Sequence, residues 1–165
     1  MTRSALIAID PGVTGAIAVQ TYRDGVRLYA MPDTLVLLYG LFQDDFDNFD
    51  VRYGDNSPIA LLENVGFHRP GNSAVASCTF ARHCGALEMA LVASRIPYTK
   101  VTPGKWMKTL YGDALPREKT ERKEYIYQQT KLAHPELPKL FKYQADALGM
   151  LDYMIREEKK NEVQS

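Results

Sequence analysis

The sequence predicts an α/β fold with a mixed central sheet, in which a three-strand antiparallel meander is followed by parallel strands and helices flank the sheet. Three strand-like runs lie close together near the start, at about 5–10, 15–21 and 26–31. Short apolar strands then alternate with helical segments through the rest of the 165 residues. We expect one domain over residues 1–160 and a disordered tail at 161–165.

The first strand ends at a single carboxylate, Asp10, and a turn that contains Pro11, Gly12 and Gly15 follows it. The apolar run after this turn predicts an antiparallel return strand. A carboxylate at the carboxyl end of a strand points into the crevice where open α/β sheets carry their sites. Glycines beside it leave room for a backbone or a phosphate to approach closely. Asp10 is therefore the first candidate site residue.

The remaining elements follow from apolar patterning, turn residues and capping residues. Arg23-Asp24-Gly25 is typical of a hairpin turn between the second and third strands. Asp33 is a candidate N-cap for the first helix, and Thr102 followed by Pro103 is typical of a helix start. Further along we expect a helix over 33–49, an acidic loop over 44–57, a strand at 58–63, a loop at 66–72, a helix over 73–94, a strand at 96–101, and helices over 117–133 and 143–159.

Two further acids stand in positions comparable to that of Asp10. Glu63 closes the apolar strand at 58–63, and Asp146 lies in the first turn of the last helix. Each alone has a simpler explanation, since a strand-end acid is often solvated and the helix dipole stabilises an acid at a helix start. Together, three carboxylates at one end of a sheet can hold Mg²⁺ or Mn²⁺, which prefer hard oxygen ligands. Two such ions about 3.5–4 Å apart would position a water and stabilise the leaving oxygen of a phosphodiester.

Three segments resemble the three motifs of the RuvC family of Holliday-junction resolvases, which has the RNase H-like fold. They are Ile7-Ala8-Ile9-Asp10-Pro11-Gly12, Leu61-Leu62-Glu63-Asn64-Val65 and Gln144-Ala145-Asp146-Ala147-Leu148. The stretches between them are also similar to the family, at Asn72-Ser73-Ala74, Ala81-Arg82-His83-Cys84-Gly85 and Val101-Thr102-Pro103-Gly104-Lys105-Trp106-Met107-Lys108. The resemblance covers about residues 5–155, and the best match is the phage and prophage branch of the family.

The resemblance implies a homodimeric, Mg²⁺-dependent endonuclease that cuts branched DNA such as a four-way junction. One or two ions per site are implied, and Mn²⁺ is expected to substitute. Asp10, Glu63 and Asp146 become metal ligands. Lys119 stands where the family has its second lysine, and would balance their charge or stabilise the transition-state phosphate. Lys108 would contact backbone phosphate.

Other candidate DNA contacts follow from the resemblance and from the charge distribution. Phe67 stands where the family has an aromatic residue that can stack on unpaired bases. The formal net charge is zero, but the stretch 95–142 contains eleven basic and five acidic residues, which predicts a basic face. Arg69 and Lys105 are further candidates, with a solvated surface as the alternative explanation.

One position departs from the pattern of the family, which usually has an Asp or His ligand three residues before the last aspartate, on the same helical face. Here that position is Tyr143, and a neutral phenol with an unperturbed pKa of about 10 is a poor Mg²⁺ ligand. The second metal ion is therefore in question, or its ligand lies elsewhere. His68, Asp152 and Lys142 are nearby in sequence only, and Asp152 is more simply explained as a surface acid.

Composition narrows the class of protein. The chain is 45% hydrophobic and 24% charged, as is typical of soluble globular proteins. No apolar run approaches the roughly 18 residues of a membrane span, and no signal-peptide pattern is visible. Cys78 and Cys84 fit reduced, buried thiols. We therefore expect no membrane partner and a cytoplasmic location in a bacterial or phage-infected cell. No nucleotide cofactor is expected, because no Gly-Lys-Ser/Thr follows the first turn.

The sequence thus predicts a nuclease that hydrolyses phosphodiesters of Holliday junctions or other branched DNA at paired symmetric positions, as a homodimer. Two alternatives stay open. One is a branched-DNA binding module with weak or no cleavage, for which Tyr143 would be the cause. The other is a nuclease for flaps, forks or RNA–DNA hybrids. The sequence also leaves open whether the helix over 73–94 is buried core or the dimer seam.

Overall fold

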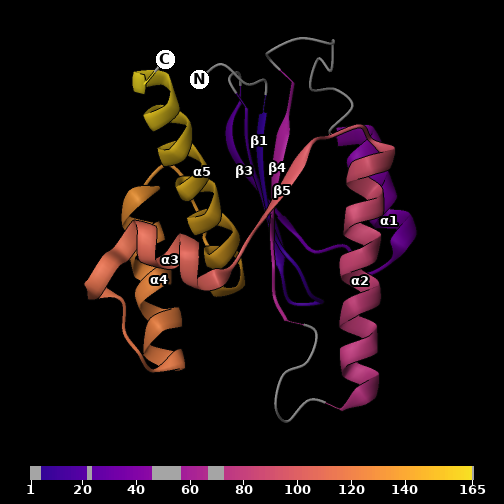
Figure 1. Ribbon diagram of the computed structural model, residues 1–165, viewed down its shortest axis with the longest axis horizontal. Coiled ribbons are helices and arrows are strands. Elements are labelled where there is room, and N and C mark those ends of the chain that lie inside the picture. The colour runs from indigo at the N-terminus through magenta and orange to yellow at the C-terminus, as the bar shows by residue number, and fades with distance from the viewer. Residues whose placement is uncertain (1–4, 22–23, 46–56, 67–72, 165) are drawn as a thin grey trace.

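The computed structural model describes residues 5–21, 24–45, 57–66 and 73–164 (Figure 1). Five strands form one sheet in the order β3-β2-β1-β4-β5. The first three strands are antiparallel neighbours, whereas β4 runs parallel to β1 and β5 runs parallel to β4. The strands are β1 (Ala5–Asp10), β2 (Ala16–Thr21), β3 (Gly25–Ala30), β4 (Ile59–Glu63) and β5 (Tyr98–Val101). The predicted mixed sheet with an antiparallel meander is confirmed.

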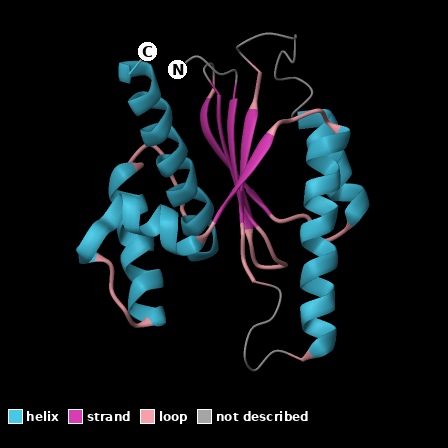
Figure 2. Ribbon diagram, in the orientation of Figure 1, coloured by secondary structure: helices cyan, strands magenta, loops and turns pink. Residues whose placement is uncertain are grey.

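Helices cover both faces of this sheet (Figure 1, Figure 2). One face carries α1 (Leu35–Gly40), its continuation as a π-helix η1 (Leu41–Asp45), and α2 (Ala74–Ala93). The other carries α3 (Pro103–Tyr111), α4 (Lys119–Ala133) and α5 (Ala145–Gln164), with the short 3₁₀ helices η2 (Gly112–Ala114) and η3 (Lys142–Gln144) before α4 and α5. No helix in the described part of the chain is both long and apolar enough to cross a membrane.

The central strand β1 divides the core into two layers. Successive side chains of a strand point to opposite faces of the sheet. Ile7 and Ile9 therefore lie in the apolar cluster beneath α1 and α2, whereas Leu6 and Ala8 lie in the cluster beneath α3, α4 and α5. Both faces of the strand are buried, as expected for a strand in the middle of a doubly covered sheet. The same alternation directs Asp10, at the end of β1, to the side of α3–α5.

The first helix differs from its prediction. Its N-cap is Thr34 and not Asp33, because the Thr34 backbone is extended and its hydroxyl accepts a hydrogen bond of 3.2 Å from the Leu37 N–H. The α-helix ends at Gly40, and the chain continues as a π-helix to Asp45, the last described residue of this segment, so the predicted end at 49 lies outside the described residues. Residues 46–56, which include most of the predicted acidic loop, lie outside the described residues.

The last helix is longer than predicted. It continues to Gln164, through most of the segment 161–165 that the sequence predicts as a disordered tail. Good helix-forming residues precede this end, and Lys160 pairs with Glu157 one turn away at 2.6 Å. The turn before β3 is described only from residue 24 onward, but the pairing of Thr21 with Gly25 confirms the predicted hairpin.

A histidine clasp joins the end of α4 to α5. His134 is the C-cap of α4, and its Nδ1 and Nε2 atoms lie 2.8 Å from Glu136 Oε1 and 2.8 Å from Asp152 Oδ1. The hydrogen bond to Asp152 and the weaker influence of Glu136 raise the pKa of His134 to about 9, although burial acts in the opposite direction. At neutral pH the protonated ring therefore holds two carboxylates from different segments.

This clasp predicts a pH-dependent stability. The pKa of about 9 in the folded state lies above the ordinary value of 6.5, so the stabilisation is fully present below about pH 6.5 and is lost as the pH rises through about 9. Urea unfolding of the wild type and of His134→Gln measures it. The difference in free energy of unfolding between the two should shrink between about pH 6 and about pH 10. A difference that stays constant over this range would contradict the assignment.

Candidate functional site

The parallel pairing of β1 with β4 brings two predicted site residues to the same end of the sheet. Ile9 is the register partner of Leu62, and the next residue on each strand is an acid, Asp10 on β1 and Glu63 on β4. Because side chains alternate along a strand, both carboxylates face the side that carries α3, α4 and α5. The two acids therefore lie at adjacent strand ends, at the lower end of the sheet in Figure 1.

The third predicted acid reaches the same place from a helix. Asp146 lies in the first turn of α5, and α5 packs against β1 and β2. Its side chain is only 19% exposed, and burial raises the pKa of the Asp146 carboxyl, while the positive charges of Lys123 and Arg122 act in the opposite direction. Lys123 Nζ lies 3.9 Å from Asp146 Oδ2, at the long end of the range for an ion pair.

All three acids line one cleft of about 770 Å³. Its walls also include the turn after β1, the start of α2 at Ala76 and Phe80, the first turns of α3, and one face of α4. The cleft thus lies at the carboxyl ends of β1 and β4, which is where the sequence places the candidate site.

The turn after β1 requires a glycine for steric reasons. The Gly15 N–H donates a hydrogen bond of 2.9 Å to the Gly12 carbonyl, which closes the turn. A Cβ atom at Gly15 would lie 2.0 Å from the carbonyl oxygen of Asp10, far inside van der Waals contact. A side chain at this position would displace the backbone of Asp10, so the glycine keeps both the turn and the carboxylate in place.

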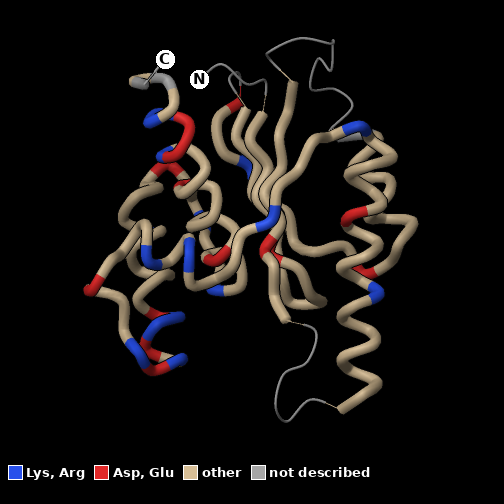
Figure 3. The backbone as a smooth tube through the Cα atoms, in the orientation of Figure 1, with Lys and Arg blue, Asp and Glu red and all other residues tan. Residues whose placement is uncertain are grey.

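Four basic side chains line the same cleft as the acids. Lys119, Arg122 and Lys123 are spaced i, i+3 and i+4 on α4 and so share one helical face, and Lys142 comes from η3. Figure 3 shows that Lys and Arg residues are more frequent on α3, α4 and α5 than on α1 and α2. Lys119 therefore lines the same cleft as the three acids, and its role stays a prediction. Arg122 and Lys123 were missed, although their helical spacing from Lys119 was visible in the sequence.

Two of the other predicted DNA contacts, Lys105 and Lys108, lie outside the wall of this cleft. Lys105 and Lys108 are exposed on α3 but do not belong to the cleft wall, so their predicted roles would require DNA that extends beyond it. Phe67 and Arg69 lie outside the described residues, as does His68. The roles of these residues stay predictions.

Tyr143, the departure from the family pattern, lines the cleft near Asp146. Its ring is 38% exposed and stacks on Phe141, with 5.6 Å between ring centroids and 20° between planes. Neighbouring Lys142 pairs with Glu124 on α4 and lies 5.9 Å from the centroid of the Tyr127 ring. A phenol therefore lines the cleft at the sequence position where the resemblance implies a metal ligand.

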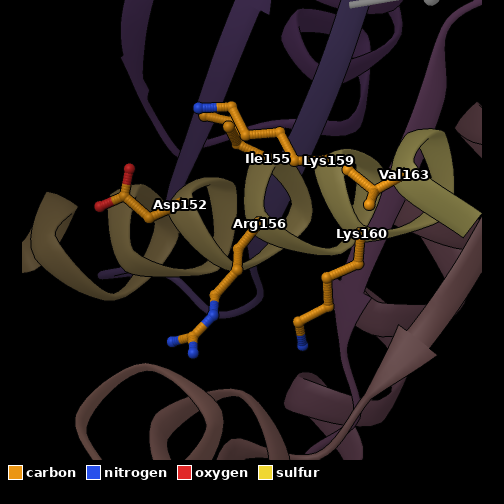
Figure 4. Close-up of a pocket in the computed structure, with 6 residues that line it drawn as sticks. All are labelled: Asp152, Ile155, Arg156, Lys159, Lys160 and Val163. Atoms are coloured by element: carbon orange, nitrogen blue, oxygen red, sulfur yellow. The ribbon is translucent and has the colours of Figure 1, made fainter.

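Asp152, the alternative ligand considered from the sequence, lies elsewhere. It borders a separate hollow of about 540 Å³ along the C-terminal half of α5, together with Arg156 and Lys159 (Figure 4). Its carboxylate is held by His134. Asp152 therefore does not replace Tyr143 in the cleft.

The donor chemistry of the cleft fits a hard divalent cation, since three carboxylates share it and at least two are largely buried. The three do not form a ready-made cage, because within the described ranges no group of three or more His, Cys, Asp or Glu side chains is arranged to hold a metal ion. The ligand set Asp10, Glu63 and Asp146 stays a prediction. The cleft itself combines acids that can bind a cation with bases that can bind an anion.

Comparison with solved structures identifies the fold. The structure is similar to that of Thermus thermophilus RuvC, with a TM-score of 0.59 and 17% identity over 93% of this chain and 96% of that one. The chain has the RuvC-like fold. A second similar structure is T. thermophilus RuvC in complex with a Holliday junction substrate, with a TM-score of 0.57 and 13% identity over 94% of this chain and 96% of that one. The predicted RNase H-like class is thereby confirmed.

No protein-family model and no curated protein matches the sequence of the chain. At sequence identities of 17% and 13%, the similarity to the two RuvC structures is a similarity of fold. The phage and prophage branch stays a prediction from the motifs.

Proposed function

We propose that this RuvC-like protein is a metal-dependent endonuclease that resolves Holliday junctions and related branched DNA by hydrolysing phosphodiesters at paired symmetric positions. The observation that carries the proposal is one cleft that is lined by Asp10, Glu63 and Asp146 together with Lys119 and the other basic side chains of α4 and η3. The likeness to a RuvC structure with a bound junction supports the choice of substrate. We place the chain in the phage and prophage branch, in the cytoplasm, on its motifs and composition alone.

The three carboxylates would hold the metal. A bound Mg²⁺ or Mn²⁺ would neutralise charge on a phosphate oxygen and make water a better nucleophile. Asp10 and Glu63 fix one edge of the site because they end hydrogen-bonded strands, and Asp146 closes it from α5. The rigid strand ends thereby limit how far the acids must move to share an ion.

The basic side chains would bind and orient the DNA. Lys119, Arg122 and Lys123 lie along one face of α4, so a phosphate backbone laid along the cleft meets several positive charges in succession. Their charge also offsets that of the acids, which lets a polyanion approach a site built from carboxylates. Lys119 would in addition stabilise the charge that develops on the phosphate.

Replacing Asp10 separates cleavage from binding. Asp10→Asn removes a predicted ligand and should lower the rate of junction cleavage by roughly a thousandfold or more. Junction affinity should be unchanged or somewhat higher, because a negative charge leaves a cleft that binds phosphate. Asp113→Asn makes the same change in an exposed acid of η2 outside the cleft, and should leave both quantities unchanged. Persistent cleavage by Asp10→Asn, or loss of junction binding, would contradict this division of roles.

A second function is favoured by Tyr143. A phenol in the cleft wall next to the acids would leave a divalent ion with fewer ligands, so the protein would bind branched DNA and cut it weakly or not at all. Tyr143→His and Tyr143→Asp test this with junction cleavage as the measurement. A large gain over the wild type supports the binding module, whereas no gain indicates that the native site is complete. Tyr143→Phe, which keeps the stacked ring, should behave like the wild type in either case.

We further propose that α2 forms the dimer seam. Six of its exposed positions follow a 3-4-3-4-3 spacing, as in a helix that packs on another helix. They are Val75, Cys78, Arg82, Gly85, Met89 and Val92. Val75, Met89 and Val92 are 76%, 62% and 57% exposed, and Cys78 is exposed although the sequence predicts it buried. A second copy of the chain is the occupant that paired symmetric cuts require.

A charge in this stripe should dissociate the dimer. Met89→Glu buries a carboxylate in the proposed seam, so its mass in solution should be that of a monomer, as measured by light scattering after gel filtration. Leu132→Glu makes the equivalent change at an apolar position on α4 that is 74% exposed, and should remain dimeric. A monomeric wild type, or a dimeric Met89→Glu, would rule out this seam.

A further inference from the structure

A hydrogen bond between side chains far apart in the sequence links Trp106 to Glu63, one of the candidate metal ligands. The Trp106 Nε1–H donates a hydrogen bond of 2.8 Å to Glu63 Oε1, across 43 positions of sequence. Both groups are buried, with Trp106 0% exposed and Glu63 8% exposed. An indole N–H can only donate, so this bond always favours the ionised carboxylate and fixes the direction of its oxygen.

The sheet brings the two side chains together. Glu63 on β4 is the register partner of Val101 on β5, and α3 begins two residues after Val101. Thr102 is the N-cap of α3, and Pro103 occupies its first turn, which starts the helix directly at the strand end. Trp106 lies on the first turn of α3. The chain therefore places its indole beside the Glu63 carboxylate, at the end of the strand that pairs with β5.

The ring is held from two other sides. A Cβ atom at Gly149 of α5 would lie 3.0 Å from Trp106 Cζ3, so α5 approaches the indole as closely as a glycine allows. Tyr111 contacts the indole edge to face, with 6.5 Å between centroids, and Tyr125 of α4 contacts Tyr111 in turn at 5.6 Å. An aromatic chain therefore connects Glu63 to α4, the helix that carries the basic residues of the cleft.

We propose that Trp106 is a positioning residue that holds Glu63 ready to bind the divalent cation. The inference rests on the proposed function, because it assigns Glu63 to the metal. Trp106 is also the single tryptophan of the chain, so its fluorescence reports directly on the carboxylate to which it is bonded. Occupation of the site by a metal ion should change that fluorescence without DNA and without catalysis.

The first test is a titration of the protein with Mn²⁺ alone, in which its tryptophan emission is measured. Mn²⁺ is paramagnetic and quenches an indole at close range, so the emission of the wild type should fall to a plateau and recover with EDTA. Glu63→Gln keeps an oxygen that can accept the indole bond but loses the charge, and its emission should show no such plateau. Calorimetry on the same samples measures whether Mn²⁺ binds at all.

The second test separates positioning from packing. Trp106→Phe keeps a buried aromatic ring but removes the N–H, and should weaken Mn²⁺ binding by about 10- to 100-fold, as loss of a ligand's hydrogen-bond partner usually does. Tyr111→Phe disturbs the same aromatic cluster without touching Glu63. It should lower thermal stability at most and leave the Mn²⁺ affinity of the protein unchanged.

The outcomes are distinguishable. If Mn²⁺ binds the wild type and Trp106→Phe with equal affinity, or binds without quenching, the role of Trp106 is overturned while the proposed nuclease stands. If the wild type binds no Mn²⁺ by calorimetry and cuts no junction, the proposed function falls and this inference falls with it. Weakened binding in Trp106→Phe together with normal binding in Tyr111→Phe is the result that we expect.

Discussion

The parallel pairing of β1 with β4 is the constraint on which the site depends. It sets Asp10 beside Glu63 and directs both carboxylates to the face covered by α3, α4 and α5. Neither acid could be moved by one residue without a change of face, because side chains alternate along a strand. The helices on that face add a third carboxylate from α5 and positive charge from α4 to the same cleft.

Burial of these acids carries an electrostatic cost that the surrounding residues offset. Glu63 receives the indole N–H of Trp106, and Asp146 has Lys123 and Arg122 nearby. The raised pKa of the Asp146 carboxyl shows that burial still outweighs this compensation. A divalent cation would relieve the same strain more fully, and so the electrostatics of the cleft agree with the proposed metal dependence.

Local patterns in the sequence were enough to predict much of this arrangement. Apolar runs that end in one acid located Asp10 and Glu63 at strand ends, and the order of strands and helices predicted the mixed sheet. Features that depend on distant partners could not be predicted, such as the bond from Trp106 to Glu63 and the clasp between His134 and Asp152. At the first helix the wrong N-cap prediction has a local cause. The Thr34 hydroxyl, and not the Asp33 carboxylate one residue earlier, accepts the hydrogen bond from the Leu37 N–H.

Strand cleavage of a synthetic four-way junction by the wild-type protein tests the central claim most directly, with linear duplex and flap substrates as controls, in Mg²⁺, Mn²⁺ and EDTA. If the cleft of three acids and four bases acts as a metal-dependent resolvase, the protein should make paired symmetric nicks in the junction alone. EDTA should abolish these nicks. Tight junction binding without nicks in either metal ion would contradict this claim. Preferential cutting of flaps would keep the nuclease but contradict the assigned substrate.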